Sequence, residues 1–543
     1  KIDWSSNFIF PDLNDDDKVK VETLEAQRGS ILDRNDNILA GNGTVSSVGI
    51  VPGKMSESRE EDIAKIAELL DISTDSIQKA LSASYVKNDT FVPIKKVSKD
   101  ATELKDKLLE IPGIKITSTQ SRVYPLGKEA SHLIGYVQNI NADELKENEG
   151  KGYNSNSIIG KTGLEKAYED TLRGIDGTEI YIEDKNGNTK KVIAKQEMQN
   201  GKNVNLTIDS EMQKKLYNQL ENDRGFFVVM QPHTGELLAL VSTPSFDSND
   251  FVLGMSNDKW NELNEDVNKP LYNRYLQTYC PGSTFKPITG AIGVTTGKID
   301  PDEDYGYSGT SWQKDSSWGN YTITTQMSYS GPKNLLNGIR YSDNIYFAQS
   351  ALKIGTDTLQ ENLNKIWFNK NMDFPLNVKA SQYSNEDNIT TEIKLADTGY
   401  GQGDLLVNPI HMASIYSAFA NYGNMIKPYI EYKENFEGEV LVENAFSTSA
   451  AKAVKEALVQ VVESGTAKDA KIDGITLAGK TGTAELKTSR EDEQRDRLGW
   501  FNCFTINDYP KDDLLIISMV EDMDTDDNGG SHYLIQKIKT LFE

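Results

Sequence analysis

The chain has 543 residues, of which 26% are charged and 37% hydrophobic. Two or more domains are expected, because this length exceeds what one compact core usually supports. The formal net charge of −24 argues against nucleic acid and anionic lipid as partners, and solubility is its simplest interpretation. With only two cysteines, Cys280 and Cys503, a disulfide-stapled secreted domain is excluded, which leaves a single bridge, a metal site or two free thiols.

The sequence shows no membrane-spanning segment. No apolar run approaches the roughly 20 residues that cross a bilayer, and no signal peptide is visible. The chain opens abruptly at Lys1-Ile2-Asp3-Trp4, which is typical of a trimmed fragment. We therefore do not take the missing anchor as a property of the natural protein.

The first part of the chain mixes short strands and helices. Residues 1–27 are polar and are predicted to be irregular, and residues 28–40 read as two short strands joined by an Asn-Asp-Asn turn. Apolar residues at helical spacing predict helices over 60–70 and 74–81, and 114–119 reads as a strand.

The character of the sequence changes near residue 205. Before it, Gly163 opens a helix to about Leu172, and strands with Gly and Asn turns fill 174–205. After it, an amphipathic helix to about Leu220 precedes two apolar strands, 226–230 and 237–241. We therefore predict an N-terminal domain over 1–204 and a second domain over 205–543.

The second domain is predicted to be an antiparallel five-stranded sheet flanked by helices. Residues 254–440 read as mainly helical, and three strands follow in hairpin order over 475–486, 499–505 and 514–520. A terminal helix starts at about Ser531. This pattern indicates an α+β, multidomain protein.

One Ser-x-x-Lys pair has the setting of a reactive site. Ser283 and Lys286 lie three residues apart between Cys280 and Pro287, after a Pro-Gly turn and before an apolar helical run. Residues i and i+3 share a helix face, so the amine can reach the hydroxyl. A serine needs an adjacent base to become a nucleophile, and a lysine can be that base only if its pKa is lowered.

Two further motifs distinguish this pair from the other Ser-x-x-Lys patterns in the chain. Ser342-Asp343-Asn344 lies on a predicted turn between helices, and Lys480-Thr481-Gly482-Thr483 lies on a predicted strand. Lys161-Thr162-Gly163 has the same letters as the third motif, but it precedes the serine and opens a helix. The three motifs in order are the signature of penicillin-binding proteins and β-lactamases.

The chain resembles a class B penicillin-binding protein, an extracytoplasmic D,D-transpeptidase, over nearly its whole length. Further segments match the family's N-terminal pedestal domain and its catalytic domain. These are Arg28-Gly29…Asp33-Arg34, Arg122-x-Tyr124-Pro125, His132-x-x-Gly135-Tyr136-Val137, Gly163-Leu164-Glu165, Gly401-Gln402-Gly403 and Trp500-Phe501. The opening Trp4…Ile9-Phe10-Pro11 is similar to the low-affinity Gram-positive branch, in which a further N-terminal domain and a membrane anchor come first.

The resemblance implies a role for each catalytic residue. Ser283 attacks the carbonyl of the penultimate D-Ala of a peptidoglycan stem peptide, and Lys286 accepts its proton. The charge of Lys480 helps to keep Lys286 neutral. Ser342 relays the proton to the departing D-Ala, and Asn344 both holds the substrate amide and orients Lys286.

The same resemblance implies a substrate-binding strand. Backbone N–H groups of Ser283 and Thr483 would form the oxyanion hole. Thr481 and Thr483, with Gly482 between them, suit the terminal carboxylate of the donor. Trp500 is expected beside them as a further substrate-binding residue.

The implied partners are peptidoglycan stem peptides, β-lactam antibiotics and a glycosyltransferase of the cell-wall machinery. The implied location is the extracytoplasmic face of the membrane, through an N-terminal anchor absent from this chain. A β-lactamase is disfavoured, because the pedestal domain has no role in a small hydrolase. A β-lactam sensor would lack the pedestal, and a non-catalytic scaffold would have no reason to retain all three motifs.

A zinc site is a further hypothesis, although acylation itself requires no cofactor. Cys280, Cys503, His411 and Asp404 together could form a tetrahedral site that braces the cleft, with His532 as an alternative histidine. No local spacing motif supports this set. The alternatives are a disulfide, or small buried cysteines beside a hydrogen-bonded core histidine.

Overall fold

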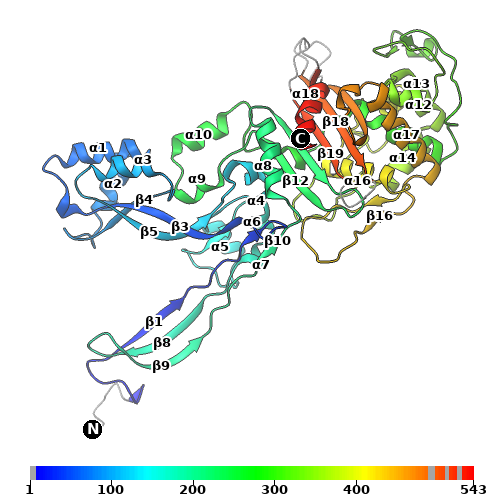
Figure 1. Cartoon of the computed structure of the whole chain (residues 1–543). Helices are drawn as coiled ribbons and strands as arrows, with labels where there is room; N and C mark the ends of the chain where they lie inside the picture. Colours follow the sequence, from blue (N-terminus) through cyan, green and yellow to red (C-terminus); the bar gives the residue numbers. More distant parts are fainter. Residues whose placement is uncertain (1–7, 487–495, 508–512, 522–528, 543) are drawn as a thin grey trace.

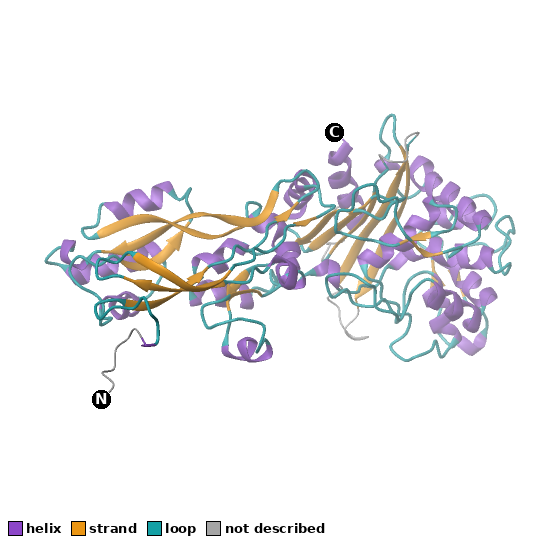
Figure 2. Cartoon of the chain, turned by 90° about the horizontal axis from the view of Figure 1, so that it is seen from below, coloured by secondary structure: helices purple, strands orange, loops and turns teal. Residues whose placement is uncertain are grey.

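A computed structural model describes residues 8–486, 496–507, 513–521 and 529–542. The molecule is elongated, with a strand-rich N-terminal part and a larger C-terminal part in which helices surround a central sheet (Figures 1 and 2). None of the helices in the described ranges combines the length and apolar character needed to cross a bilayer.

The C-terminal part is built on the predicted five-stranded sheet. Its strands run in the order β12, β11, β19, β18, β17, and every neighbouring pair is antiparallel. The inner strands are buried on both faces, so they read as continuous apolar runs rather than alternating ones. The strands are β11 (Gly225–Met230), β12 (Leu237–Thr243), β17 (Thr476–Leu486), β18 (Asp496–Ile506) and β19 (Leu515–Val520).

Helices cover both faces of this sheet. The helices α8 and α18 contact each other and pack on the strands, whereas α16 and α17 form a second packed pair that also contacts the sheet and α11. Asp209 caps α8 by accepting a hydrogen bond from the backbone N–H of Met212 at 2.9 Å. The bounds are α8 (Ser210–Leu220), α11 (Lys286–Thr295), α16 (Pro409–Ala420), α17 (Thr448–Ser464) and α18 (Gly529–Lys539).

A helical region covers the end of α11. Here α13 packs on α11, α14 and α15, and α12 packs on α17. The bounds are α12 (Leu335–Arg340), α13 (Asn344–Ile354), α14 (Thr356–Lys365) and α15 (Glu392–Gly399), with the short strands β13 (Ser311–Trp312), β14 (Ile323–Thr324), β15 (Met425–Ile426) and β16 (Val440–Val442).

The N-terminal part contains its own sheet and its own hydrophobic cluster. Strand β3 pairs with β2, β4 and β5, and β10 adds to β2 in parallel. Helices α1, α2 and α3 lie over the β3–β5 end (Figure 1). The bounds are β2 (Ile31–Leu32), β3 (Ile38–Ile50), β4 (Val92–Val97), β5 (Ile114–Val123), β10 (Val204–Asn205), α1 (Arg59–Leu70), α2 (Thr74–Leu81) and α3 (Thr102–Leu109).

A three-stranded arm projects away from the rest of the molecule (Figure 1). It consists of β1 (Lys18–Leu24), β8 (Gly177–Glu183) and β9 (Thr189–Gln196). The prediction that residues 1–27 are irregular is therefore wrong for β1. The alternation of Lys-Val-Lys-Val is a strand pattern that the many charged residues nearby concealed.

Short helices and strands join the arm and the sheet to the C-terminal part. The helix predicted from Gly163 to Leu172 is interrupted at Tyr168 and forms α6 and α7. The bounds are α4 (Ser131–Ile134), α5 (Ala142–Glu147), α6 (Gly163–Ala167), α7 (Glu169–Leu172), α9 (Ser248–Leu253), α10 (Asn257–Glu265), β6 (Val137–Asn139) and β7 (Ile158–Gly160).

A buried ion cluster joins three of the N-terminal motifs. The carboxylate of Glu165, which is 0% exposed, accepts hydrogen bonds from Arg28 Nε at 2.8 Å and Arg122 Nε at 2.7 Å. Arg28 also pairs with Glu169 at 2.8 Å, and Arg122 donates to the Gly29 carbonyl at 2.8 Å. The motifs that looked unrelated in the sequence thus form one polar core.

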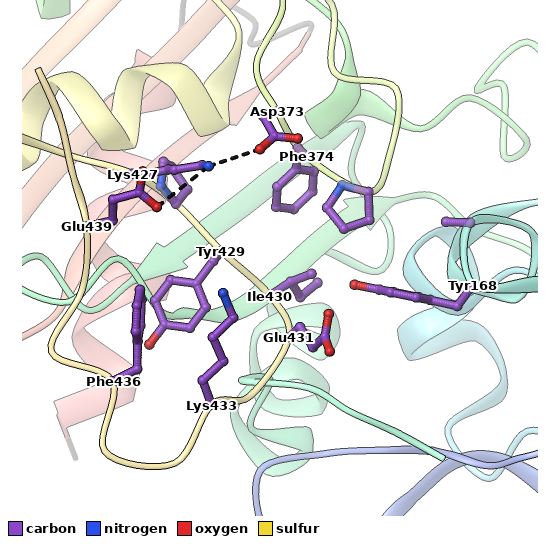
Figure 3. A pocket seen from close by; sticks show the side chains of 13 residues that line it. Tyr168, Asp373, Phe374, Lys427, Tyr429, Ile430, Glu431, Lys433, Phe436 and Glu439 are labelled. Carbon is purple, nitrogen blue, oxygen red and sulfur yellow. Dashed lines mark hydrogen bonds and ion pairs between the residues drawn. The ribbon is translucent and has the colours of Figure 1, made fainter. Parts of the chain in front are cut away.

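A cavity of about 400 Å³ lies where the N-terminal part meets the C-terminal part. Tyr168, at the interruption between α6 and α7, points into it from one side, and Tyr429 and Phe436 face it from the other (Figure 3). Lys427 pairs there with Asp373 at 3.0 Å. Ser283 does not line this cavity.

Candidate active site

Ser283 lies in a 3₁₀ turn, Gly282–Phe285, that leads directly into α11. Gly282 has a φ of 52°, and a Cβ on it would lie 2.4 Å from the carbonyl oxygen of Thr483. Only glycine allows this close approach. The serine turn and the middle of β17 are therefore in direct contact.

The amine of Lys286 lies at the centre of a group of four oxygen atoms. Its Nζ is 2.9 Å from Ser283 Oγ and 3.0 Å from Ser342 Oγ. It is also 2.6 Å from the Ser342 carbonyl and 2.7 Å from Asn344 Oδ1. A neutral amine can donate to the last two oxygens and still present its lone pair to the Ser283 hydroxyl.

Burial favours that neutral form. Lys286 is 0% exposed, and desolvation together with the nearby charge of Lys480 holds the pKa of Lys286 well below its usual value, although Asp343 opposes this. Desolvation also lowers the pKa of Lys480, to about 7. The two amines thus meet the electrostatic condition for a lysine base.

The Ser342-Asp343-Asn344 motif occupies the predicted turn between α12 and α13. Ser342 has a φ of 59° and places its hydroxyl between two amines, since Lys480 Nζ lies 3.0 Å from the same Oγ. Asp343 caps α13 through the backbone N–H of Ile345 at 2.9 Å. This cap fixes the start of the helix that carries Asn344.

The amide of Asn344 is held at both ends. Its oxygen contacts Lys286, as described above, and its nitrogen donates to the Thr324 carbonyl at 2.7 Å. The predicted contact with Lys286 is therefore present. One N–H of the amide is used by Thr324, which leaves the other for a substrate.

Strand β17 forms one wall of a cavity of about 390 Å³ that contains Ser283. Thr481, Gly482 and Thr483 line it together with Ser342 and Asn344. A Cβ on Gly482 would lie 2.8 Å from Thr284 Cγ2, so the strand and the serine turn approach closely here too. The segments that carry the two expected oxyanion-hole amides are thus neighbours.

Trp500 differs from its prediction as a substrate-binding residue. Its side chain is 0% exposed and does not line the cleft that contains Ser283. The indole N–H donates to the carbonyl of Cys280 at 3.1 Å, and the ring packs edge-on against Phe226. Trp500 therefore supports the serine turn from inside the core.

The structure does not assemble the predicted zinc site. Within the described ranges, no group of three or more histidine, cysteine, aspartate or glutamate residues could hold a metal. Both ring nitrogens of His411 are already hydrogen-bonded, to Ser381 Oγ at 2.7 Å and to the Ile366 carbonyl at 2.8 Å. Asp404 instead pairs with Lys394 at 2.9 Å.

Both cysteines are free and buried, so the alternative of a disulfide is wrong as well. Cys280 Sγ donates to the Gly401 carbonyl at 3.2 Å, and burial raises the pKa of Cys280 to about 11. Burial also raises the pKa of Cys503. Protonated thiols in apolar surroundings are poor metal ligands, which agrees with the simpler interpretation of small core residues. His532 lines the catalytic cleft and contacts Asp469 at 3.3 Å.

Sequence reasoning missed several residues of the cleft. Thr466 contacts Thr481 through a hydroxyl pair at 2.8 Å and is brought there by the loop after α17. Others are Gln326 and Met327 from the segment before α12, Tyr341 at the end of α12 and Tyr400 at the end of α15. Gln402 also lines the cleft, and it belongs to the Gly401-Gln402-Gly403 segment that matched the family.

Comparison with known proteins agrees with this geometry. The penicillin-binding protein transpeptidase domain family matches residues 225–541, and the penicillin-binding protein dimerisation domain family matches residues 23–206. The chain is 41% identical over 544 residues to penicillin-binding protein 3 of Bacillus subtilis, which covers 100% of this chain and 80% of that protein. It is 28% identical over 510 residues to the peptidoglycan D,D-transpeptidase MrdA of Acinetobacter baumannii, covering 88% and 74% of the two chains.

A solved structure has the same architecture. It is a complex between penicillin-binding protein PBP2 and MreC from Helicobacter pylori, with a TM-score of 0.75, 26% identity, and coverage of 97% of this chain and 99% of that one. The chain therefore belongs to the penicillin-binding protein family, as a class B member with a dimerisation domain and a transpeptidase domain.

Proposed function

We propose that the chain is a peptidoglycan D,D-transpeptidase that forms an acyl-enzyme on Ser283 and is acylated at the same residue by β-lactams. The single observation that carries the mechanism is the buried Lys286 amine, 2.9 Å from Ser283 Oγ. This distance lies within the range for direct proton transfer to a general base.

Acylation begins when Ser283 Oγ attacks the carbonyl carbon of the penultimate D-Ala. The new C–O bond forms as the hydroxyl proton moves to the neutral Lys286. Collapse of the tetrahedral intermediate breaks the peptide bond, and the amine of the terminal D-Ala needs a proton to leave. Ser342 Oγ, 3.0 Å from both lysine amines, can pass that proton on.

Deacylation by an amine completes the cross-link. The amino group of a second stem peptide attacks the ester carbonyl of the acyl-enzyme and loses a proton to Lys286. The new peptide bond forms and Ser283 regains its hydrogen. A β-lactam enters by the same first step, but its leaving amine stays tethered in the opened ring, so the ester persists.

Electrostatic stabilisation would come from the strand and the serine turn. The backbone N–H groups of Ser283 and Thr483 are the proposed oxyanion donors, a contribution that is often the largest in such sites. The hydroxyls of Thr481 and Thr483, with the Lys480 charge behind them, suit the terminal carboxylate of the donor.

We also propose a domain boundary, a branch of the family, a location and a partner for the enzyme. The boundary between the pedestal and the catalytic domain is placed at residues 204 and 205, ahead of α8. Membership of the low-affinity Gram-positive branch rests on the opening Trp4…Ile9-Phe10-Pro11, of which Trp4 lies outside the described residues. That branch implies an N-terminal membrane anchor, an extracytoplasmic location and a glycosyltransferase partner.

Labelling with a fluorescent penicillin tests this function. The wild-type chain is expected to carry a covalent label that persists for many minutes, and Ser283→Ala is expected to carry none. Persistent labelling of Ser283→Ala would refute the nucleophile assignment. Release of the label from the wild type within seconds would favour a β-lactam hydrolase instead.

A further inference from the structure

Residues 307–329, which we call the cover segment, lie between α11 and α12 in the chain and reach the catalytic cleft. They include β13 and β14, and two of their side chains, Gln326 and Met327, line the same cavity as Ser283 and Thr483. Met327 is 46% exposed although it is apolar, so it presents an uncovered apolar surface at the cleft.

Asp343 holds the cover segment with one oxygen and the catalytic helix with the other. Its Oδ1 caps α13, as described above. Its Oδ2 accepts hydrogen bonds from the hydroxyls of Tyr307 at 2.5 Å and Tyr329 at 3.0 Å. Because Asn344 is the first residue of α13, one buried carboxylate sets the position of the cover segment relative to Asn344.

A second carboxylate repeats this arrangement at the other side of the segment. Asp397, on α15, accepts a hydrogen bond from Tyr321 at 2.5 Å and another from Tyr400. Tyr400 lines the cleft, so Asp397 joins the cover segment to the side of the cleft that Tyr400 forms. Both hydroxyls are donors at neutral pH, because tyrosine ordinarily has a pKa of about 10 and burial raises the pKa of Tyr321 and Tyr307 further.

The cover segment also contacts the catalytic motif directly. The Thr324 carbonyl accepts the Asn344 amide hydrogen bond, which fixes the amide oxygen toward Lys286. The ring of Tyr329 stacks on Tyr341, another cleft residue, with 4.6 Å between centroids. Asn344 is also held by the start of α13, which Asp343 caps, and by Lys286. A shift of the segment should therefore mainly change the shape of the wall.

We propose that the cover segment is the specificity wall for the peptide chain of the acyl donor, and that Tyr307, Tyr321 and Tyr329 are positioning residues that hold it on Asp343 and Asp397. The inference rests on the proposed function and deepens it. The three hydroxyls bond to Asp343 and Asp397 rather than to Ser283 or Lys286, so they act through the segment and not on reacting atoms.

The lining of the wall fits an extended peptide. Gln326 offers an amide donor and an amide acceptor, and Asn344 offers its second N–H. Met327, Tyr341 and Tyr400 provide apolar surface among these polar groups. An extended peptide presents polar backbone N–H and C=O groups between its side chains, which matches this mixture of polar and apolar groups. Benzylpenicillin is much smaller than a stem peptide, so we expect it to contact less of this wall.

The experiment compares two reagents that share the reactive ring. One is benzylpenicillin, and the other is a penicillin whose acyl group is a tripeptide of stem-peptide length. Second-order acylation rate constants are measured by intact mass for wild type, for the double variant Tyr307→Phe/Tyr329→Phe, and for Gln326→Ala. In the double variant we expect the rate with the peptidyl penicillin to fall about tenfold, and the rate with benzylpenicillin less than about twofold.

Gln326→Ala tests the wall without touching the tyrosines and should lower the same ratio of rate constants. Tyr305→Phe is the matched control: it removes a hydroxyl that contacts Ser350 Oγ at 3.2 Å, outside the cover segment, and should leave the ratio unchanged. An unchanged ratio in both the double variant and Gln326→Ala would overturn this inference, and so would an equal slowing with both reagents. If neither penicillin acylates the wild type, the proposed function itself fails.

Discussion

Replacing Lys480 with methionine should stabilise the protein at neutral pH while it impairs acylation. The side chain is 0% exposed, and burial lowers its pKa from 10.5 to about 7. An unfolded chain regains the ordinary value, so between pH 7 and 10.5 the unfolded state binds a proton that the folded state does not. Stability therefore rises with pH across this window and is lowest at and below pH 7.

The size of the stability change follows from the pKa shift of Lys480. Burying the amine costs about 4 kcal/mol at pH 7, about 2 kcal/mol at pH 9 and about 1 kcal/mol at pH 10. Its contacts with Ser342 Oγ at 3.0 Å and the Thr481 carbonyl at 2.9 Å return about 2–3 kcal/mol. Methionine has a similar volume, carries no charge to bury and makes neither hydrogen bond. The variant should therefore be more stable than wild type at pH 7 by about 1–2 kcal/mol.

The assay is urea unfolding of wild type and Lys480→Met, followed by tryptophan fluorescence at several pH values between 7 and 10. The variant's advantage in stability should disappear near pH 9 and reverse at pH 10, because the cost of burying the Lys480 amine falls with pH and only the wild type has that amine. A variant that is less stable than wild type at pH 7, or a difference that does not depend on pH, would refute the reasoning.

Three other changes follow from the packing. Glu165→Gln should destabilise the pedestal by about 3–5 kcal/mol in urea unfolding, because Arg28 and Arg122 lose a buried counter-charge; Glu179→Gln, which breaks a 3.9 Å pair in the arm, should cost less than about 1 kcal/mol. Burial lowers the pKa of His411 to about 4, so as the pH falls from 6.5 to 4 this histidine is protonated in the unfolded state before it is protonated in the folded state. In unfolding titrations over that range, the free energy of unfolding should fall by about 3 kcal/mol more for wild type than for His411→Gln. Trp500→Phe removes the hydrogen bond to the Cys280 carbonyl and should slow penicillin acylation about fivefold to tenfold in stopped-flow measurements, whereas Trp367→Phe, which removes a surface indole bond, should have no effect.

The elements that the sequence predicted well have strong periodicity or clear end signals. Helix α2 has the predicted bounds, Thr74 to Leu81, because Ser73 caps it and Ile77 anchors its buried face. The strands β11 and β12, on either side of residue 230, are continuous apolar runs, and every residue in both is buried. The three motifs were identifiable because serine, lysine and asparagine occur together in fixed order on elements of the expected type.

The parts that failed depend on contacts between residues distant in the chain. Trp500 lies on β18 opposite Gly482 of the Lys-Thr-Gly-Thr strand. This pairing does not determine whether its ring points into the cleft or into the core. His411 was a plausible zinc ligand until Ser381 and the Ile366 carbonyl were found at its two nitrogens. Hydrogen-bond partners that come from irregular loops leave no spacing pattern in the sequence.

The cover segment is a similar case. Tyr307, Tyr321 and Tyr329 are separated by irregular spacing and carry no motif, so only the fold reveals that their hydroxyls meet Asp343 and Asp397. The middle residue of the Ser-Asp-Asn motif thus has a structural use that its position between two catalytic residues did not indicate.

Cross-link formation tests the central claim most directly. The protein is supplied with glycan strands that carry pentapeptide stems, and the muropeptides are separated and identified by mass. Wild type should produce dimers that lack one D-Ala, and Ser283→Ala should produce none. Equal dimer yields from the two proteins, or trimmed monomers without any dimers from the wild type, would contradict the assignment of this chain as a transpeptidase acting through Ser283.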